Sequence, residues 1–400
     1  MTAPDANGGA AHGQPASVAG PKATPLHDVH SRLGATLVPF AGWLMPVRYA
    51  SETAEHKAVR STAGLFDLSH MGEITVHGPG AAAALDYALV GHLSTMAPGR
   101  ARYTMICAAD GGVLDDLIVY RLAEDEYLVV ANAANTDVVF HELRQRAANR
   151  APGTTVTDAT RDYALIAIQG PSAVAILGRR TTAPLTGIKY YTAVPADVAG
   201  IPVLLARTGY TGEDGFELFC QGEQAVAVWA ALTEAGAGDG LVPAGLAARD
   251  TLRLEAGMPL YGNELGRDLT PFEAGLGRVV KLDKPDDFVG REALAARAQA
   301  GPRRTLIGLA LRTRRVPRHG HPVLLNGQVI GAVTSGAPSP TLGRPIAMAY
   351  VQPDAASGLR EAADAGAGGA PDETASFAVD VRGHAEPADY AQLPFYRRAR

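Results

Sequence analysis

The chain has 400 residues, of which 47% are hydrophobic and 19% are charged, which is enough apolar material for two or three globular domains. Its formal net charge of −5 gives no general electrostatic reason to bind a nucleic acid or a membrane surface. Its two cysteines, Cys107 and Cys220, lie in apolar strand-like runs and indicate neither a disulfide framework nor a metal site. No apolar run approaches the roughly 20 residues that cross a bilayer, and the histidines lack metal-ligand spacing. We therefore expect a cytoplasmic protein without a metal.

Residues 1–22 predict a disordered tail, because they contain too few large apolar side chains to offset the entropy cost of ordering. Residues 23–160 predict a first α+β domain, and residues 161–300 a second. The strands expected in these domains are 103–107, 116–120, 127–131, 163–169, 201–206 and 216–220. The helices expected there are 79–90, 136–147, 223–235, 246–256 and 291–300.

Residues 301–400 read as short strands separated by Gly and Pro turns, which predicts a small C-terminal β-barrel domain. The strands expected in it are 306–311, 322–325, 329–335, 346–351 and 376–381. The segment 353–374 is rich in Gly, Ala and Asp, and we expect it to be a mobile surface loop. The predicted fold class is α+β, with two antiparallel-sheet domains followed by the barrel.

The first candidate site is the run GGVLDDLIVY at 111–120, where a glycine turn leads into an apolar strand. Side chains alternate along a strand, so Asp115 and Asp116 point to opposite faces and cannot form a carboxylate dyad. One of them would face a cavity or core, and the other would face solvent. An equally good explanation places both in a hairpin turn, where Asp is common.

The second candidate is RTGYTGEDGFE at 207–217, whose glycines allow the backbone to approach a ligand closely. The run lacks the spacing of a phosphate-binding loop or a dinucleotide fingerprint, so we do not expect it to bind a nucleotide. The Glu217 carboxylate suits the adjacent N–H donors of a pterin or a guanine. An acidic hairpin explains the same composition equally well.

The third candidate lies on the predicted helix 246–256, where Arg249 and Arg253 are four residues apart and share a face. The two charges repel each other unless a carboxylate or an anionic ligand lies between them. An anion site satisfies this condition. Surface arginines neutralised by Asp250 and Glu255 satisfy it as well.

Taken together, these runs resemble the T-protein of the glycine cleavage system, from about residue 24 to the C-terminus. The matching motifs occur in that family's order: TPL at 24–26, FAGW at 40–43, FDLSHM at 66–71, the GGVLDD run, IQGP at 168–171, GYTGEDG at 209–215, LRLEAG at 252–257 and TSG at 334–336. The resemblance implies a ring of three domains around a central folate channel, with the two α+β domains of ferredoxin-like type.

The resemblance also implies an activity. Tetrahydrofolate would serve as co-substrate in releasing ammonia from the aminomethyl-dihydrolipoyl H-protein, giving 5,10-methylenetetrahydrofolate and dihydrolipoyl H-protein, in cooperation with the P- and L-proteins. Carried over by motif, Asp116 would be the catalytic acid and Asp115 a structural or solvent-facing neighbour. Glu217 and Arg249 match ligand-binding positions. The weaker carry-overs as folate-lining residues are Tyr103, Met71, Asn132, Tyr261 and Tyr396.

Other functions must be weighed against this one. Sarcosine and dimethylglycine dehydrogenases carry a related domain fused to a flavin domain, for which this chain has no room. A non-catalytic folate-binding paralogue would carry a Lys-Gly-Cys motif, which is absent here. A scaffold that only docks the H-protein is the remaining alternative, and a test of folate-dependent ammonia release separates it from an enzyme.

Overall fold

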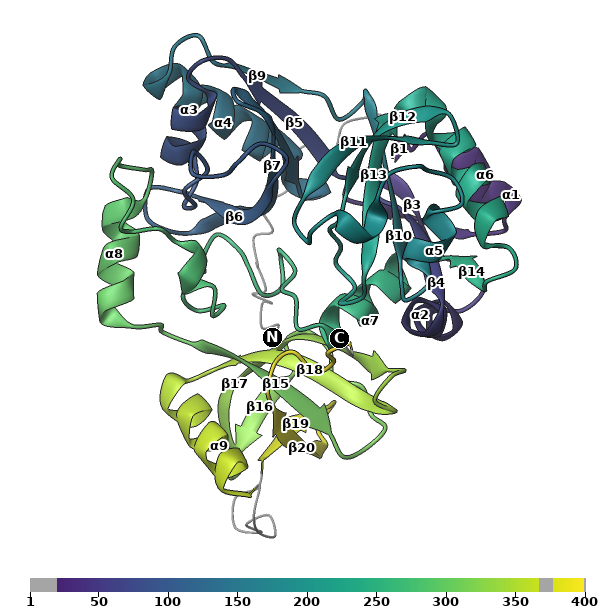
Figure 1. The fold of residues 1–400 in the computed structure, drawn as a ribbon. Coiled ribbons are helices and arrows are strands. Elements are labelled where there is room, and N and C mark those ends of the chain that lie inside the picture. Colours follow the sequence, from purple (N-terminus) through teal and green to yellow (C-terminus); the bar gives the residue numbers. More distant parts are fainter. Residues whose placement is uncertain (1–19, 367–376, 399–400) are drawn as a thin grey trace, which may run out of the picture.

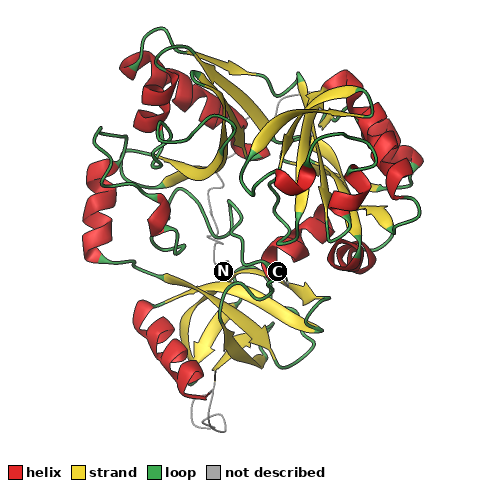
Figure 2. Ribbon diagram, in the orientation of Figure 1, coloured by secondary structure: helices red, strands yellow, loops and turns green. Residues whose placement is uncertain are grey.

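Two open sheets and a closed barrel stand around the middle of the molecule (Figure 1). The structure is a computed structural model that describes residues 20–366 and 377–398. The first sheet, in blue, and the second, in teal, lie side by side above the green and yellow barrel. Helices cover the outer faces of both sheets, as Figure 2 shows. The predicted α+β class with a C-terminal barrel is therefore confirmed.

The first sheet has the strand order β6-β7-β8-β5-β9, and its neighbouring strands are antiparallel. Its strands are β5 (Gly72–His77), β6 (Ala101–Cys107), β7 (Val113–Ala123), β8 (Glu126–Ala131) and β9 (Thr155–Asp158). One face packs against helices α3 (Ala81–Ala88) and α4 (Thr136–Arg150), with Ile74, Leu117 and Val129 in the buried layer between them. Alternation along the strands leaves the other face for a second layer.

The second sheet has the order β11-β12-β13-β10-β4-β14. Its strands are β4 (Ala63–Asp67), β10 (Tyr163–Gln169), β11 (Ala193–Val198), β12 (Ile201–Ala206), β13 (Gly215–Gln221) and β14 (Leu241–Pro243). Helices α5 (Ala173–Leu177) and α6 (Ala225–Gly236) pack on its outer face, where Leu218 and Trp229 are buried. The short helix α1 (His27–Arg32) lies beside α6 (Figure 1).

Strand pairing differs from the linear division that the sequence predicted at residue 160. Strand β4 pairs antiparallel with β10, so a segment from the first half of the chain completes the second sheet. One edge of the second sheet departs from the antiparallel pattern, because β14 runs parallel to β4. Both departures depend on which strands lie next to each other in space, and the order of the strands along the chain does not reveal this.

An apolar layer joins the inner faces of the two sheets. Ile118 and Tyr120 of β7 contribute to it from the first sheet, and Leu165 and Phe219 from the second. The rings of Tyr120 and Phe219 meet edge to face with their centroids 5.5 Å apart. Helices α2 (Glu52–Ser61) and α7 (Leu246–Glu255) pack against each other and add buried side chains to the same layer. The two sheets therefore share one core.

The barrel closes in the order β15-β18-β17-β16-β19-β20. Its strands are β15 (Thr305–Leu311), β16 (Pro322–Leu325), β17 (Gln328–Ser339), β18 (Arg344–Val351), β19 (Phe377–Asp380) and β20 (Ala385–Ala391). Helix α8 (Arg291–Ala300) precedes it, as predicted. Near the N-terminus a small sheet of order β1-β3-β2 consists of β1 (Lys22–Ala23), β2 (Thr36–Phe40) and β3 (Trp43–Arg48).

The prediction of a mobile loop at 353–374 is wrong over its first part, because helix α9 (Pro353–Gly366) forms there. Alanine and leucine favour a helix, and Ala356 and Leu359, three residues apart, turn a small apolar face toward the barrel core. The Gly and Asp content of the segment concealed this face. Residues 367–374, like residues 1–19 of the predicted tail, lie outside the described part of the chain. Lys22, at the end of that tail, lies in β1 and pairs with Trp43 of β3.

Cys107 and Cys220 are both buried free thiols, as expected. Burial raises the pKa of the Cys107 thiol to about 12, so it is an inert core side chain at neutral pH. No helix in the described ranges is both long and apolar enough to cross a membrane.

Candidate active site

The glycine turn before β7 is required by the local packing. Gly111 adopts a φ of +87°, a conformation that side chains other than glycine disfavour. A Cβ on Gly112 would lie 2.1 Å from the main-chain oxygen of Arg267, so no side chain fits there. The two glycines therefore let β7 begin at Val113, against the segment that contains Arg267, and this places the two aspartates near its start.

Asp115 and Asp116 share one hydrogen-bond donor although they leave the strand on opposite sides. The Asn132 amide nitrogen Nδ2 lies 2.9 Å from Asp115 Oδ1 and 2.8 Å from Asp116 Oδ1. Asp115 is fully buried, whereas Asp116 is partly exposed. Of the two alternatives predicted for Asp115, structural or solvent-facing, the second is therefore wrong. The two carboxylates are not independent of each other.

The second oxygen of Asp116 also has a donor. The Tyr103 hydroxyl donates to Asp116 Oδ2 at 2.9 Å, from the neighbouring strand β6. Burial raises the pKa of Asp116 above its usual value, against the lowering effect of the hydrogen bonds from Tyr103 and Asn132. Burial and the charge of Asp116 raise the pKa of Asp115 to about 8. The pair therefore binds a proton at a higher pH than exposed aspartates do.

Tyr261, one of the predicted folate-lining residues, also lies at this cluster. Its hydroxyl donates to the Val113 main-chain oxygen at 3.3 Å, beside the glycine turn. Burial and the nearby charges of Asp115 and Asp116 raise the pKa of Tyr261. Three of the predicted folate-lining residues, Tyr103, Asn132 and Tyr261, thus gather around Asp116.

Glu217 occupies a second position on the same inner layer. It lies on β13 and is 8% exposed, and its Oε2 accepts from the Thr208 hydroxyl at 2.5 Å and from the Tyr120 hydroxyl at 3.4 Å. Its other oxygen, Oε1, has no hydrogen-bond partner among the described residues. Burial raises the pKa of Glu217, and Thr208 and Arg249 counteract the rise. The acidic-hairpin explanation is therefore insufficient, because this carboxylate is buried with one acceptor atom to spare.

Strand β7 contributes side chains both to the Asp116 cluster and to the surroundings of Glu217. Asp116 and Tyr120 are four residues apart, so they leave β7 on the same face at a separation of about 13 Å along the strand. Tyr120 reaches Glu217 across the layer between the sheets. Asp116 and Glu217 are thus placed at two ends of one inner surface. Tyr120 was not among the predicted site residues, although its spacing of four residues from Asp116 along a strand indicates a shared face.

Arg249 differs sharply from Arg253. Arg253 is paired with Asp250 and Glu264, so neutralisation by carboxylates explains its position. Arg249 has no carboxylate within 4 Å among the described residues, and its guanidinium lies 4.7 Å from the ring centroid of Tyr210. Burial lowers the pKa of Arg249, while the charge of Glu217 opposes that change. An unpaired cation facing Glu217 remains available for a ligand.

No hydrogen bond joins the other two predicted lining residues to Asp116 within the described residues. Met71 is partly buried and packs against the apolar layer between the sheets. Tyr396 stacks under the Arg60 guanidinium, which is 4.0 Å from its ring centroid, and its main-chain nitrogen donates to the Glu255 main-chain oxygen at 2.8 Å. No hydrogen bond joins Tyr396 to Asp116 or Glu217 within the described residues.

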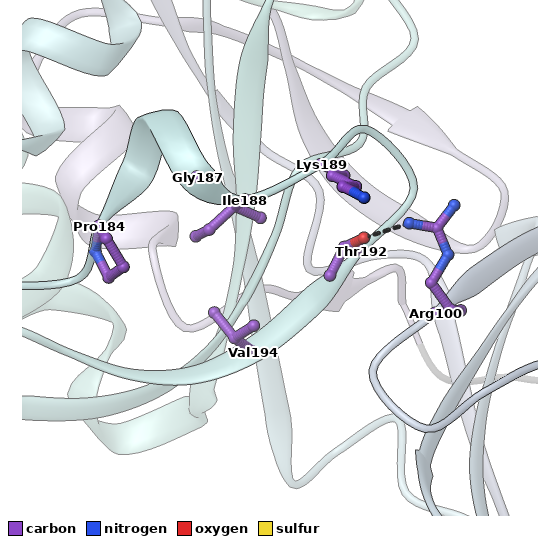
Figure 3. Close-up of a pocket in the computed structure, with 7 residues that line it drawn as sticks. All are labelled: Arg100, Pro184, Gly187, Ile188, Lys189, Thr192 and Val194. Atoms are coloured by element: carbon purple, nitrogen blue, oxygen red, sulfur yellow. Dashed lines mark hydrogen bonds between the residues drawn. The ribbon is translucent and has the colours of Figure 1, made fainter.

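An open groove elsewhere at the contact between the sheets contains none of the predicted site residues (Figure 3). Arg100 donates to the Thr192 hydroxyl there at 2.6 Å, and the exposed Lys189 lies beside them. The groove is therefore separate from the Asp116 cluster. Across the described chain, no group of three or more His, Cys, Asp or Glu side chains is arranged to hold a metal ion.

Comparison with known proteins decides the family. Residues 26–284 match the GCVT N-terminal domain, and residues 304–397 match the glycine cleavage T-protein C-terminal barrel domain. The chain belongs to the glycine cleavage T-protein family. The second match coincides with the barrel, and the first spans both sheets, which agrees with the strand exchange at β4.

Similar proteins cover nearly the whole chain. An aminomethyltransferase from Streptomyces avermitilis is 61% identical over 381 residues, which are 94% of this chain and 98% of that protein. An aminomethyltransferase from Geobacillus kaustophilus is 43% identical over 95% of this chain and its own full length. The crystal structure of the glycine cleavage system aminomethyltransferase from Bartonella henselae has a TM-score of 0.83 at 35% identity, covering 94% of this chain and 98% of that one.

Proposed function

We propose that the chain is an aminomethyltransferase of the glycine cleavage system. Its substrate is the aminomethyl group on the dihydrolipoyl arm of the H-protein, and its products are ammonia, 5,10-methylenetetrahydrofolate and dihydrolipoyl H-protein. The activity class is that of relatives which align with this chain almost from end to end. The family functions within the glycine cleavage system. The alternatives of a non-catalytic folate-binding paralogue and a docking scaffold gain no support from these relatives.

The observation that carries the proposal is the pair of side chains Glu217 and Arg249, neither of which forms a salt bridge within the described residues. A buried carboxylate with a spare acceptor atom suits the neighbouring N–H donors on the edge of a pterin. An arginine without a carboxylate partner suits a polar or anionic part of the same ligand. Both side chains keep polar atoms free to bind a ligand, so the residues present fit tetrahydrofolate.

Asp116 is the residue we assign to proton transfer. Folate supplies the nitrogen atoms N5 and N10 that receive the one-carbon unit. Tyr103 and Asn132 each hold one oxygen of Asp116, which fixes the plane of its carboxyl group. A raised pKa makes the Asp116 carboxylate a better proton acceptor near neutral pH, so it is suited to polarise N10 or to relay its proton.

The partners in this proposal are the lipoylated H-protein directly and the P- and L-proteins through the system as a whole. Cytoplasmic location and the absence of a bound metal also stay predictions. None of them alters the roles given to Asp116, Glu217 and Arg249.

The test is to incubate the chain with aminomethyl-loaded H-protein and tetrahydrofolate, and to measure ammonia and 5,10-methylenetetrahydrofolate together. We expect both products in equal amounts, with ammonia release much slower when folate is omitted. A docking scaffold would bind the loaded H-protein and release no ammonia in either mixture, and that result would overturn the proposal.

A further inference from the structure

Asp115 accepts several hydrogen bonds, although it does not face the layer between the sheets. Its Oδ2 accepts from the Asn132 main-chain nitrogen at 2.9 Å. Its Oδ1 accepts from Asn132 Nδ2 at 2.9 Å and from Asn135 Nδ2 at 2.6 Å. Three donors therefore hold a fully buried carboxylate on the side of β7 away from Glu217.

The Asn132 side-chain amide connects Asp115 to Asp116 by hydrogen bonds. An asparagine amide has two N–H donors, and here each points at a carboxylate: one at Asp115 Oδ1 and one at Asp116 Oδ1. Rotating the amide by half a turn would put its oxygen against both carboxylates, which is repulsive. Asp115 thus fixes which way the Asn132 amide faces, and that amide in turn fixes one oxygen of Asp116.

We propose that Asp115 is a positioning residue for the transfer reaction: it locks the Asn132 amide, and through this amide it sets the orientation and the ionisation of Asp116. The proposal rests on the function proposed above for Asp116. It replaces the view of Asp115 as a bystander, because both carboxylates belong to one hydrogen-bonded unit.

The charges around Asp116 give the sign of the effect. The groups that face it are Tyr103 from β6, Tyr210 from the loop before β13, Tyr261 from the loop after α7, and Asp115 with Asn132. No Lys, Arg or His side chain forms an ion pair with either aspartate among the described residues. Of these neighbours, only Asp115 is a second carboxyl group, and its pKa of about 8 means that the pair keeps a proton near neutral pH. Without Asp115 there is no second acid to repel the charge of Asp116, so the ionisation of Asp116 must be complete at lower pH.

The test is Asp115→Asn, which keeps the shape of the side chain and removes its ionisable group. Two quantities are measured between pH 5 and 9: the dependence of kcat/KM on pH, and the titration of the Asp116 carboxyl carbon by NMR in protein labelled at aspartate and free of substrate. We expect the acidic limb of the rate profile and the NMR midpoint to move together, by at least half a pH unit toward lower pH. We also expect kcat to fall about tenfold, with KM for folate changed less than threefold.

Asp86→Asn is the matched control. Asp86 is a buried aspartate of α3 that accepts from main-chain nitrogens at Leu93 and Ser94 and forms no hydrogen bond with Asp115, Asp116 or Asn132. Its replacement costs stability in a similar way, and it should move neither the rate profile nor the NMR midpoint. If Asp115→Asn fails to fold, Asn135→Ala removes one donor from Asp115 without touching Asp116. It should give a smaller shift of the same sign, because an Asp115 carboxylate with one donor fewer is ionised less.

An unshifted NMR midpoint in Asp115→Asn would overturn this inference, whatever the activity. A loss of kcat equal to that of Asp86→Asn, with the rate profile unchanged, would do the same by showing a purely structural role. Failure of the proposed function has a different signature, since the unmodified chain would then release no ammonia while the NMR titration still reports on Asp115.

Discussion

Replacing Glu255 by Gln tests how α7, the helix that carries Arg249, is held in place. Glu255 is fully buried at the end of α7 and accepts hydrogen bonds from α2 and from the barrel. From α2 the donors are His56 Nε2 at 3.1 Å and Arg60 Nη2 at 2.9 Å. From the turn between β17 and β18 the Thr341 hydroxyl donates at 2.7 Å. One carboxylate therefore joins α7 to two other parts of the molecule.

The magnitude follows from the pKa of this group. Its surroundings lower the pKa of Glu255 from 4.5 to about 2: burial works against ionisation, and the hydrogen bonds from His56, Ser339 and Thr341 outweigh it. At about 1.4 kcal/mol for each pH unit, this difference corresponds to about 3 kcal/mol of stability at neutral pH. Breaking a buried ion pair costs roughly 3–5 kcal/mol, which agrees. Because the pKa is lowered in the folded state, this stability is present above about pH 4.5 and is lost as the pH falls toward 2.

The assay is urea unfolding followed by tryptophan fluorescence, since Trp43 and Trp229 are both buried. At pH 7 we expect Glu255→Gln to lose about 3 kcal/mol in free energy of unfolding, and at pH 3 to lose clearly less. The control is Glu124→Gln, because Glu124 is 82% exposed where it pairs with Arg121, and such a pair contributes about 0.5 kcal/mol. A loss below 1 kcal/mol, or an equal loss at pH 7 and pH 3, would refute the reasoning.

Two further predictions concern the ligand site. Glu217→Gln should raise the dissociation constant for tetrahydrofolate at least tenfold, as measured by calorimetry, because the variant loses a charged acceptor. The control is Glu223→Gln, at an exposed position close in sequence, which should leave this constant unchanged. Equal affinities in the two variants would contradict the assignment. Tyr103→Phe removes the hydroxyl that donates to Asp116 Oδ2, and this hydrogen bond lowers the pKa of Asp116. The acidic limb of kcat/KM should therefore move to higher pH, opposite to the shift in Asp115→Asn. A shift to lower pH would show that Tyr103 does not stabilise the carboxylate.

Much of the fold is readable from local patterns. Strands such as β10 and β12 have the bounds that alternation and apolar runs predicted, and helix α8 matches residue for residue. What could not be read is partnership between distant segments. Nothing local in β4 says that it pairs with β10, about a hundred residues later in the chain. The helix α9 was missed for a related reason, since its short apolar face acquires meaning only against the barrel core.

For the site, too, local patterns could be predicted from the sequence and long-range contacts could not. Alternation gave opposite faces for Asp115 and Asp116, and Asp115 is indeed on the side away from Glu217. It could not reveal Asn132, which reaches both carboxylates from the end of β8 and joins them again. For the two arginines of α7, spacing predicted a need for counter-charges, and only the structure shows that Arg253 has them and Arg249 does not. Long-range contacts therefore decide which of two equal candidates is free for a ligand.

The most direct test of the central claim compares Asp116→Ala with the unmodified chain in two measurements, turnover with aminomethyl-loaded H-protein and equilibrium binding of tetrahydrofolate. If Asp116 transfers or polarises a proton at a folate held by Glu217 and Arg249, turnover should fall by roughly a hundredfold or more while the folate dissociation constant changes only a few-fold. Asp115→Ala should be milder in turnover. Unimpaired turnover in Asp116→Ala, or a loss explained entirely by weaker folate binding, would contradict the account.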